Sequence, residues 1–187
     1  MKEMTLLDMF RSHTGRQIDK WEHYFPIYEF HFQKYRGQSP RVLEIGIDHG
    51  GSLQLWKRYF GRSAEIIGVD IDSSTLFRED QITTYAYKNG QVDPEIANLG
   101  PFDIIIDDGS HKVEDQSATF ANLWPRCQGV YLIEDCHGAY PMLTPNPQLL
   151  YRYPWVIVAE RAKRRIVGTP SRELRSDEAE ARALYAR

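Results

Sequence analysis

The sequence predicts an α/β fold of the doubly wound, Rossmann-like type, with a mainly parallel seven-stranded sheet covered by helices. Three observations lead to this fold class. Short apolar runs typical of buried strands alternate with segments of helical periodicity, which favours a parallel sheet with helices on both faces. A glycine-containing turn follows the first run. Two later runs end in acidic residues, as expected where the carboxyl ends of parallel strands form a ligand-binding edge.

The N-terminal segment, residues 1–40, is expected to form a helical cap on the sheet. One amphipathic helix is predicted over 17–36, with a kink at Pro26, because proline removes a backbone hydrogen bond inside a helix. Its helical periodicity comes from aromatic side chains spaced by three and four positions: Trp21, Tyr24, Tyr28 and Phe32. This stripe is predicted to pack in the core rather than to form a binding surface.

The elements of the sheet follow in order along the chain. Strands are predicted over residues 41–47, 64–72, 82–87, 102–107 and 129–134, and helices over 51–60 and 114–124. The first strand, helix and second strand form a βαβ unit with a right-handed crossover. Residues 136–154 contain several prolines and are expected to form an irregular substrate loop or lid. Two β-rich runs within 155–168 predict an antiparallel hairpin at the sheet edge.

Composition limits the classes of protein to which the chain can belong. With 187 residues, 42% hydrophobic and 26% charged, the chain is predicted to form one domain over 1–187. Its formal net charge of -3 argues against general nucleic-acid or membrane-surface binding, and the basic run 160–168 is predicted to be a solvated hairpin tip. Two cysteines without CxxC spacing, Cys127 and Cys136, and no apolar run of membrane-spanning length favour a cytoplasmic protein.

The first chemical motif is VLEIGIDHGGS, residues 42–52. Glycines after the first strand of such a sheet allow a tight turn and a close approach of a ligand to the backbone. The spacing Gly46-x-x-x-Gly50-Gly51 differs from the G-x-G-x-x-G pattern, which favours a nucleoside-like ligand without a pyrophosphate. Asp70 ends the second strand, where a carboxylate accepts hydrogen bonds from ribose hydroxyls. The simpler alternative is an ordinary strand-to-helix turn with Asp70 as a helix cap.

The second motif consists of acidic residues at the ends of two later strands, in FDIIIDDGSH and GVYLIED. The acids expected to meet at one sheet edge are Asp108, Glu134 and Asp135. A hard cation such as Mg²⁺ relieves the repulsion between such carboxylates, and a neutral imidazole at His111 is placed to take a proton from a substrate hydroxyl. Asp107 is either a further ligand or an outer support of the site. The structural alternative is a turn in which Ser110 caps the next helix.

Together with VLEIGIDHGGSLQLW, IIGVDID and the upstream segment DKWEHYFPIYEFHF, these motifs resemble class I S-adenosylmethionine-dependent O-methyltransferases. The resemblance runs over residues 14–160 and is to the metal-dependent enzymes that methylate sugars on macrolides and related glycosylated natural products. It implies that Gly46 and its loop bind the methionine side of the cofactor, that Asp70 binds the ribose, and that His111 is the general base. The magnesium ligands that it implies are Asp108, Glu134 and Asp135. The full set of expected cofactor-binding residues is Tyr24, Glu44, Gly46, Gly50, Ser52, Asp70 and Asp107.

The sequence departs from this family's pattern in the segment NGQVD, residues 89–93. Gly90 stands where the family commonly has an acidic contact to the adenine, so the resemblance does not say how the adenine is held. Several of the macrolide enzymes also carry a large N-terminal auxiliary domain, which residues 1–40 do not supply. Their oligomeric state and substrate are therefore not transferred to this chain, and self-association into a homo-oligomer stays open.

The activity that the sequence predicts is S-adenosylmethionine-dependent O-methylation assisted by Mg²⁺ or Mn²⁺. The expected partner is a small-molecule hydroxyl acceptor, a sugar hydroxyl on a glycosylated natural product being favoured, with no nucleic-acid or membrane partner. Two alternatives stay open. One is a catechol-type metal-dependent O-methyltransferase acting on a phenolic small molecule, and the other is a non-catalytic cofactor-binding protein of the same fold.

Overall fold

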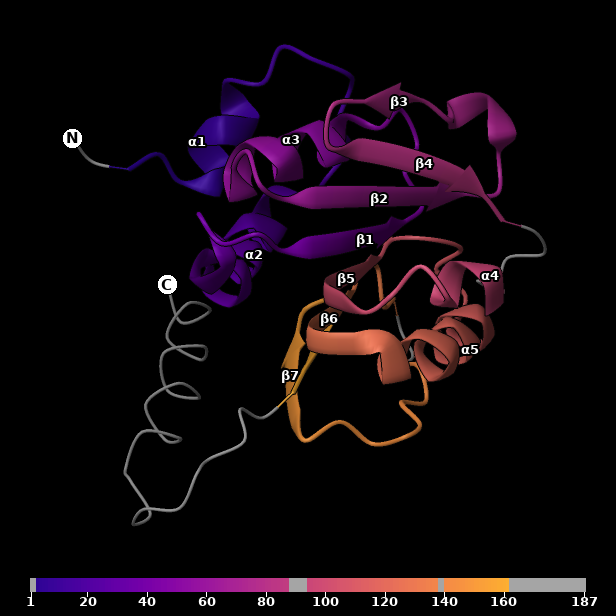
Figure 1. Cartoon of the computed structure of the whole chain (residues 1–187). Coiled ribbons are helices and arrows are strands. Elements are labelled where there is room, and N and C mark those ends of the chain that lie inside the picture. The colour runs from indigo at the N-terminus through magenta and orange to yellow at the C-terminus, as the bar shows by residue number, and fades with distance from the viewer. Residues whose placement is uncertain (1–2, 88–93, 138–139, 162–187) are drawn as a thin grey trace.

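The computed structural model describes residues 3–87, 94–137 and 140–161, which form an eight-stranded sheet with helices on both faces (Figure 1). The strands are β1 (Arg41–Ile45), β2 (Glu65–Asp70), β3 (Arg78–Glu79), β4 (Ile82–Ala86), β5 (Phe102–Asp107), β6 (Cys127–Ile133), β7 (Leu149–Tyr153) and β8 (Val156–Glu160). Their order across the sheet is β3-β4-β2-β1-β5-β6-β8-β7. The predicted fold class, a mainly parallel sheet that ends in an antiparallel hairpin, is confirmed.

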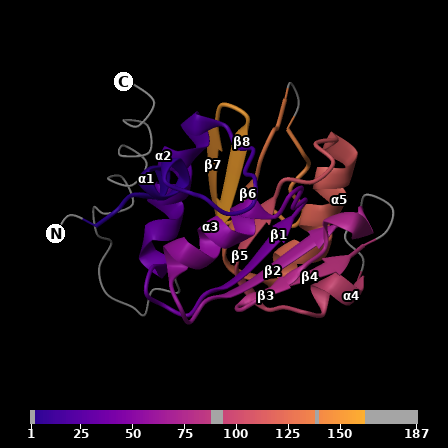
Figure 2. The ribbon, with the colours of Figure 1, turned by 90° about the horizontal axis from the view of Figure 1, so that it is seen from above.

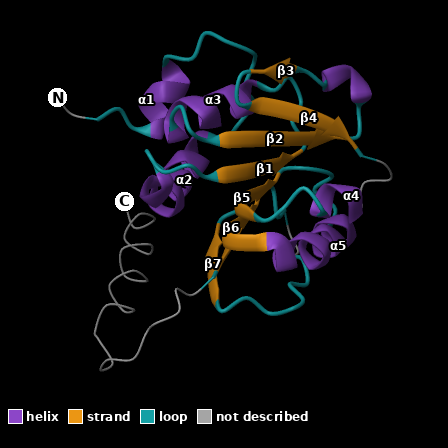
Figure 3. Cartoon of the chain, in the orientation of Figure 1, coloured by secondary structure: helices purple, strands orange, loops and turns teal. Residues whose placement is uncertain are grey.

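Two layers of helices cover the sheet (Figures 2 and 3). The helices are α1 (Leu6–Arg11), α2 (Phe25–Phe32), α3 (Gly51–Phe60), α4 (Pro94–Ala97) and α5 (Val113–Leu123), with short 3-10 turns over Glu22–Tyr24, Gln33–Tyr35, Ser73–Thr75 and Trp124–Arg126. One apolar cluster joins α1, α2 and α3 to one face of the sheet, and a second joins α4 and α5 to the other face. Alternate residues of each central strand therefore face different helical layers.

The parallel strands bring the candidate site residues to one edge of the sheet. β1 pairs in parallel with β2 and β5, β5 pairs in parallel with β6, and β2 pairs in parallel with β4. Backbone bonds continue beyond the strand ends, since the N–H groups of Gly46, Asp108 and Glu134 donate to the carbonyls of Val69, Ile45 and Asp107. The turns that follow β1, β5 and β6 therefore lie next to one another at the carboxyl edge.

Within the described residues, the sheet has eight strands rather than the seven expected. The additional strand, β3, pairs antiparallel with β4 through only two residues, Arg78 and Glu79. Both side chains are polar, so the sequence has no alternation of apolar and polar residues here from which a strand could be predicted. It extends the sheet away from the candidate site and does not change the order of the parallel strands.

The C-terminal hairpin lies earlier in the chain than predicted. It is formed by β7 and β8, so Leu149–Tyr153 is a strand and not part of an irregular loop as expected for 136–154. The burial of β7 alternates between half-buried and exposed positions, which is typical of an edge strand and weakens its apolar signal. The second β-rich run of the predicted hairpin, residues 162–168 of the basic run and residues 89–93 lie outside the described residues. In the part of the chain that the structure describes, no helix is long and apolar enough to span a membrane.

The helix predicted over 17–36 is shorter than expected. α2 begins at Phe25, with Pro26 in its first turn, where a missing N–H costs nothing, so no kink arises at the proline. Tyr24, Tyr28 and Phe32 are buried as predicted, whereas Trp21 lies before the helix and is 52% exposed. The aromatic stripe is therefore a core feature at three of its four positions, and Trp21 belongs to the loop that leads to the sheet edge.

Candidate active site

A cavity of about 630 Å³ lies at the carboxyl edge of the sheet. The predicted site residues that line it are Gly46, Ser52, Asp70, Asp108, His111, Glu134 and Asp135. They come from the end of β2, the turns after β1, β5 and β6, and the start of α3, which is the arrangement that open α/β sheets use for ligands. The sequence therefore located the cavity, although not every predicted residue reaches it.

Asp70 holds the turns on one side of the cavity. Its Oδ2 accepts hydrogen bonds from the N–H groups of Ile47 (2.8 Å) and Asp48 (3.3 Å), and its Oδ1 accepts one from Asp72 (2.9 Å). Gly46 has φ of 79°, and a Cβ at this position would collide with the backbone oxygen of Asp108. Glycine is therefore required at position 46 for the close approach of two turns, besides any contact with a ligand.

Four of the predicted cofactor-binding residues do not line the cavity: Tyr24, Glu44, Gly50 and Asp107. Glu44 is fully buried on the α3 side of β1, where its Oε2 accepts hydrogen bonds from Ser52 Oγ (2.8 Å) and Trp56 Nε1 (3.0 Å). The alternation of side chains along β1 explains this position, since Glu44 and the apolar Val42 share one face. Glu44 therefore lies outside the cavity lining, and its contact with the cofactor stays a prediction.

Tyr24 and Asp107 support the site from outside the cavity. The Tyr24 hydroxyl donates a 2.5 Å hydrogen bond to Asp135 Oδ1, which fixes the orientation of that carboxylate. Asp107 lies on the α5 side of β5, near the hydroxyl of Tyr131, and burial raises the pKa of Asp107 to about 7. Gly50 has the left-handed conformation at the N-cap of α3 and shapes the turn. Asp107 thus has the outer supporting position that the sequence left open.

Lys20 is the residue that the sequence analysis missed. Its side chain is only 4% exposed, and its Nζ lies 2.6 Å from Asp108 Oδ2, 3.0 Å from Glu134 Oε2 and 3.1 Å from Glu44 Oε1. Burial opposes the charge of this ammonium, but the three carboxylates raise the pKa of Lys20 well above its ordinary value. Lys20 is therefore a buried cation that joins acids from three strands.

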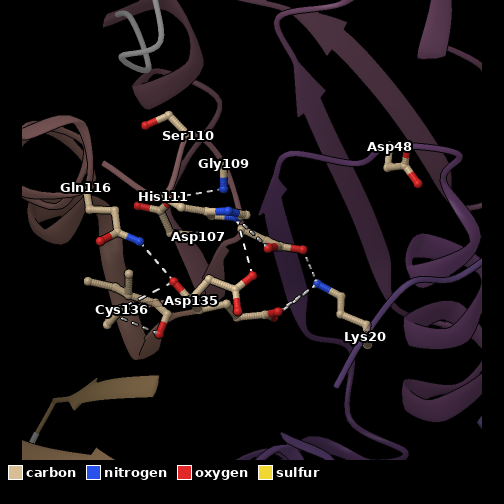
Figure 4. Close-up of polar contacts among 12 residues, drawn as sticks. Lys20, Asp48, Asp107, Gly109, Ser110, His111, Gln116, Asp135 and Cys136 are labelled. Atoms are coloured by element: carbon tan, nitrogen blue, oxygen red, sulfur yellow. Dashed lines mark hydrogen bonds and ion pairs between the residues drawn. The ribbon is translucent and has the colours of Figure 1, made fainter. Parts of the chain in front are cut away.

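Asp108, His111 and Asp135 form a second charged group beside Lys20. One ligand atom from each lies within 4.8 Å of the other two, and His111 Nε2 is 3.0 Å from Asp108 Oδ1 and 3.6 Å from Asp135 Oδ2. Figure 4 shows the side chains of His111 and Asp135 directed toward each other, with Lys20 nearby. The hydrogen bond to Asp108 raises the pKa of His111. Although burial opposes ionisation of Asp108, the charges of Lys20 and His111 hold the pKa of Asp108 below its usual range.

Glu134 lines the same cavity but is not part of this group of three. Its Oε1 and Oε2 accept hydrogen bonds from Lys20 (3.1 and 3.0 Å), and its Oε1 accepts one from the buried Tyr28 hydroxyl (2.8 Å). The next residue, Asp135, has φ of 52°, and this left-handed conformation turns its side chain toward His111 instead. Two of the three predicted metal ligands therefore converge with the predicted base.

Ser110 does not cap α5. The N-cap of this helix is Lys112, and no side-chain cap is present. Ser110 Oγ accepts a 3.3 Å hydrogen bond from the Lys112 N–H and donates a 2.7 Å bond to Asp115. His111 has φ of 58°, a conformation that costs energy for a residue other than glycine and is frequent at functional sites. The simple capped-helix explanation of DDGSH is therefore wrong.

The balance of charges fits a divalent cation. The carboxylates of Glu44, Asp108, Glu134 and Asp135 are gathered around one ammonium and one imidazole. Carboxylate oxygens are the ligands that Mg²⁺ and Mn²⁺ prefer, and acids in excess of cations repel one another when they are half-buried. The donor atoms of Asp108 and Asp135, with His111 beside them, are therefore suited to hold such an ion.

The chain is similar to several known methyltransferases, although no protein-family model matches it. It is 44% identical over 145 residues to demethylmacrocin O-methyltransferase of Streptomyces fradiae, covering 68% of this chain and 36% of that protein. It is 40% identical over 148 residues to the 8-demethyl-8-(2-methoxy-alpha-L-rhamnosyl)-tetracenomycin-C 3'-O-methyltransferase of Streptomyces olivaceus, covering 71% of this chain and 38% of that protein.

A solved structure extends the similarity to nearly the whole chain. The MycE methyltransferase from the mycinamycin biosynthetic pathway, in complex with Mg and SAH, superimposes with a TM-score of 0.69 and 30% identity over 91% of this chain. The chain resembles the natural-product sugar O-methyltransferases. The resemblance predicted from the motifs is thus confirmed. The chain spans 36% and 38% of the length of the two curated relatives and 58% of the MycE chain.

Proposed function

We propose that the chain binds S-adenosylmethionine in the cavity at the carboxyl edge and transfers its methyl group to a sugar hydroxyl of a glycosylated natural product. The observation that carries this proposal is that one cavity holds both Asp70 with the glycine turn and the group formed by Asp108, His111 and Asp135. The names of the relatives support the substrate class, since one acts on a rhamnosyl-bearing compound. The MycE complex supports the use of Mg and an S-adenosyl cofactor.

The cavity suits a cofactor with a ribose at one end and a sulfonium ion at the other. Asp70 lies at the end of β2, where its carboxylate would accept hydrogen bonds from the ribose hydroxyls. Gly46 and Ser52 would border the methionine part. The acids on the opposite side of the cavity, among them Asp108 and Asp135, would attract the positive sulfonium.

The first prediction concerns the affinity for the cofactor. Replacing Asp70 by Ala should weaken S-adenosylmethionine binding by roughly 1.5 to 3 kcal/mol, because two charge-assisted hydrogen bonds to the ribose are lost. Isothermal titration calorimetry measures this directly. The matched control is Asp80→Ala, which removes an exposed carboxylate outside the cavity lining and should leave the affinity unchanged. An unchanged affinity in a folded Asp70→Ala protein would remove the nucleoside assignment.

The carboxylates of Asp108 and Asp135 would hold the divalent ion, with Glu134 as a further oxygen donor within reach of Lys20. When bound, such an ion would supply the Lewis acidity that makes an acceptor hydroxyl easier to deprotonate. Tyr24 orients Asp135 through its hydroxyl, and Lys20 keeps Asp108 ionised. These contacts would fix the orientation and the ionised state of the carboxylate ligands in the metal-free protein.

His111 would take the proton of the acceptor hydroxyl at Nδ1, because Nε2–H donates a hydrogen bond to the carboxylate of Asp108. In the neutral ring Nδ1 has the free lone pair, and the neighbouring carboxylates of Asp108 and Asp135 stabilise the imidazolium that forms. The acceptor oxygen then forms a bond to the methyl carbon while the bond from carbon to sulfur breaks. The products are the methyl ether and S-adenosylhomocysteine, and the proton stays on His111 until it passes to solvent.

The second prediction concerns the ion. Excess chelator should abolish methyl transfer, and added Mg²⁺ or Mn²⁺ should restore it, because the acids at the sheet edge need a divalent ion to act on the hydroxyl. Asp135→Ala should not recover at ordinary metal concentrations. Glu114→Ala, an exposed acid in the first turn of α5, is the control that should recover fully. Full activity in excess chelator would contradict the metal-assisted mechanism.

The substrate class is tested by mass spectrometry of reaction mixtures that contain S-adenosylmethionine, Mg²⁺ and a panel of acceptors. Rhamnosylated polyketides and macrolide glycosides should give methyl ethers, with formation of S-adenosylhomocysteine. Methylation of catechols alone would indicate the phenolic alternative. Tight cofactor binding without turnover on any acceptor would indicate a non-catalytic binding protein.

A further inference from the structure

Four aromatic rings gather beside the candidate active site and are not used by the chemistry described above. They belong to Trp21, His23, His137 and Trp155, and are called the ring cluster here. The centroid of the Trp155 ring lies 5.5 Å from that of Trp21, 5.4 Å from that of His23 and 4.9 Å from that of His137. The cluster joins the loop before α2, the segment after β6 and the turn between β7 and β8.

The tryptophans of the ring cluster are unusually exposed. Trp21 is 52% exposed and Trp155 is 39% exposed, although a tryptophan normally buries most of its surface. Trp155 also has φ of 63°, which is costly for a bulky residue, and the hydrogen bond from the Cys136 N–H to the Trp155 carbonyl (2.8 Å) holds the turn in place. The two-residue turn between β7 and β8 accounts for this conformation, and it fixes the position of the Trp155 ring.

The ring cluster borders the reacting groups. Trp21 lines the cavity next to Lys20. On the other side, His137 Nε2 lies 3.5 Å from Asp135 Oδ1, and Asp135 in turn faces His111. A ligand packed against these rings would therefore have one edge directed at the proposed base and metal ligands.

We propose that the ring cluster binds the sugar ring that carries the acceptor hydroxyl. The faces of Trp21 and Trp155 would pack against the C–H groups of a pyranose, and the ring nitrogens of His23 and His137 would form hydrogen bonds with its hydroxyls. An apolar surface flanked by a few polar groups is the combination that orients such a ligand. The inference rests on the proposed function and specifies where its substrate lies.

The test is saturation-transfer-difference NMR with methyl α-L-rhamnopyranoside as the probe, in the presence of S-adenosylhomocysteine and Mg²⁺. The wild-type protein should transfer magnetisation to the ring C–H protons of the sugar. Trp21→Ala and Trp155→Ala should lose this signal, and Trp21→Phe should keep part of it because an aromatic face remains. Tyr85→Ala, which removes an exposed ring from β4 outside the ring cluster, is the control that should behave as wild type.

A kinetic readout uses an accepted glycoside. Trp21→Ala should raise the KM for the acceptor about 3- to 10-fold while kcat and the affinity for S-adenosylhomocysteine stay nearly unchanged. The two measurements test the two proposals separately. The NMR signal tests sugar binding at the ring cluster, and turnover tests methyl transfer, which can be absent from a protein that still binds the sugar. The inference is overturned if wild type gives no sugar signal, if the signal survives both alanine substitutions, or if catechol competes for the rings better than the sugar.

Discussion

Replacing Lys20 by methionine is expected to lower the free energy of unfolding by about 3 to 5 kcal/mol at neutral pH, the cost of removing one partner from a buried ion pair. Methionine keeps the length of the side chain but not its charge. The carboxylates of Asp108, Glu134 and Glu44 would then lie close together without the ammonium that now touches all three. Urea denaturation of the metal-free protein gives the difference.

Two further variants distinguish the loss of the charge from the loss of packing. Lys112→Met replaces an exposed lysine that caps no helix with its side chain, and it should change the stability by no more than about 0.5 kcal/mol. Adding Glu134→Gln to Lys20→Met should recover part of the loss, because the double variant removes a buried negative charge along with the positive one. A Lys20→Met protein as stable as the Lys112→Met control would contradict the assigned role.

Replacing His111 by alanine is expected to lower the rate of methyl transfer by about 100-fold to 10,000-fold, the usual effect of losing a general base. The side chain is 40% exposed, and its contacts are to the carboxylates of Asp108 and Asp135, so the fold does not depend on it. The melting temperature and the affinity for S-adenosylmethionine should therefore stay close to those of wild type. Single-turnover kinetics on an accepted glycoside measure the chemical step.

The control for His111 is His49→Ala, an exposed histidine in the turn after β1 that does not line the cavity. It should keep the wild-type rate. A stable His111→Ala protein with a near-normal single-turnover rate would exclude His111 as the base. His137, which lies 3.5 Å from Asp135, would then be the next residue to replace.

The sequence predicted the parallel sheet and the position of the cavity because both depend on local patterns. Apolar runs mark the buried strands, and the carboxyl ends of parallel strands meet at one edge, so Asp70, Asp108 and Asp135 were placed correctly at that edge. Side chains alternate along β1, which places Glu44 beneath α3 and outside the cavity lining.

Other features depend on contacts between distant parts of the chain. Lys20 pairs with Glu134, which is 114 residues away in the sequence, and a single lysine in a polar segment carries no local sign of burial. The left-handed backbone conformation of Asp135 directs its side chain away from that of Glu134. The residues GVYLIED do not indicate this change of direction. The hairpin was misplaced because β7 is a half-exposed edge strand with little apolar periodicity.

A crystal structure of the protein grown with S-adenosylhomocysteine and Mn²⁺ tests most directly the claim that the cavity at the carboxyl edge is a joint cofactor and metal site. The account predicts the ribose hydroxyls against the carboxylate of Asp70 and an anomalous manganese peak at the carboxylates of Asp108 and Asp135. A nucleoside bound away from Asp70, or manganese bound away from both Asp108 and Asp135, would contradict it.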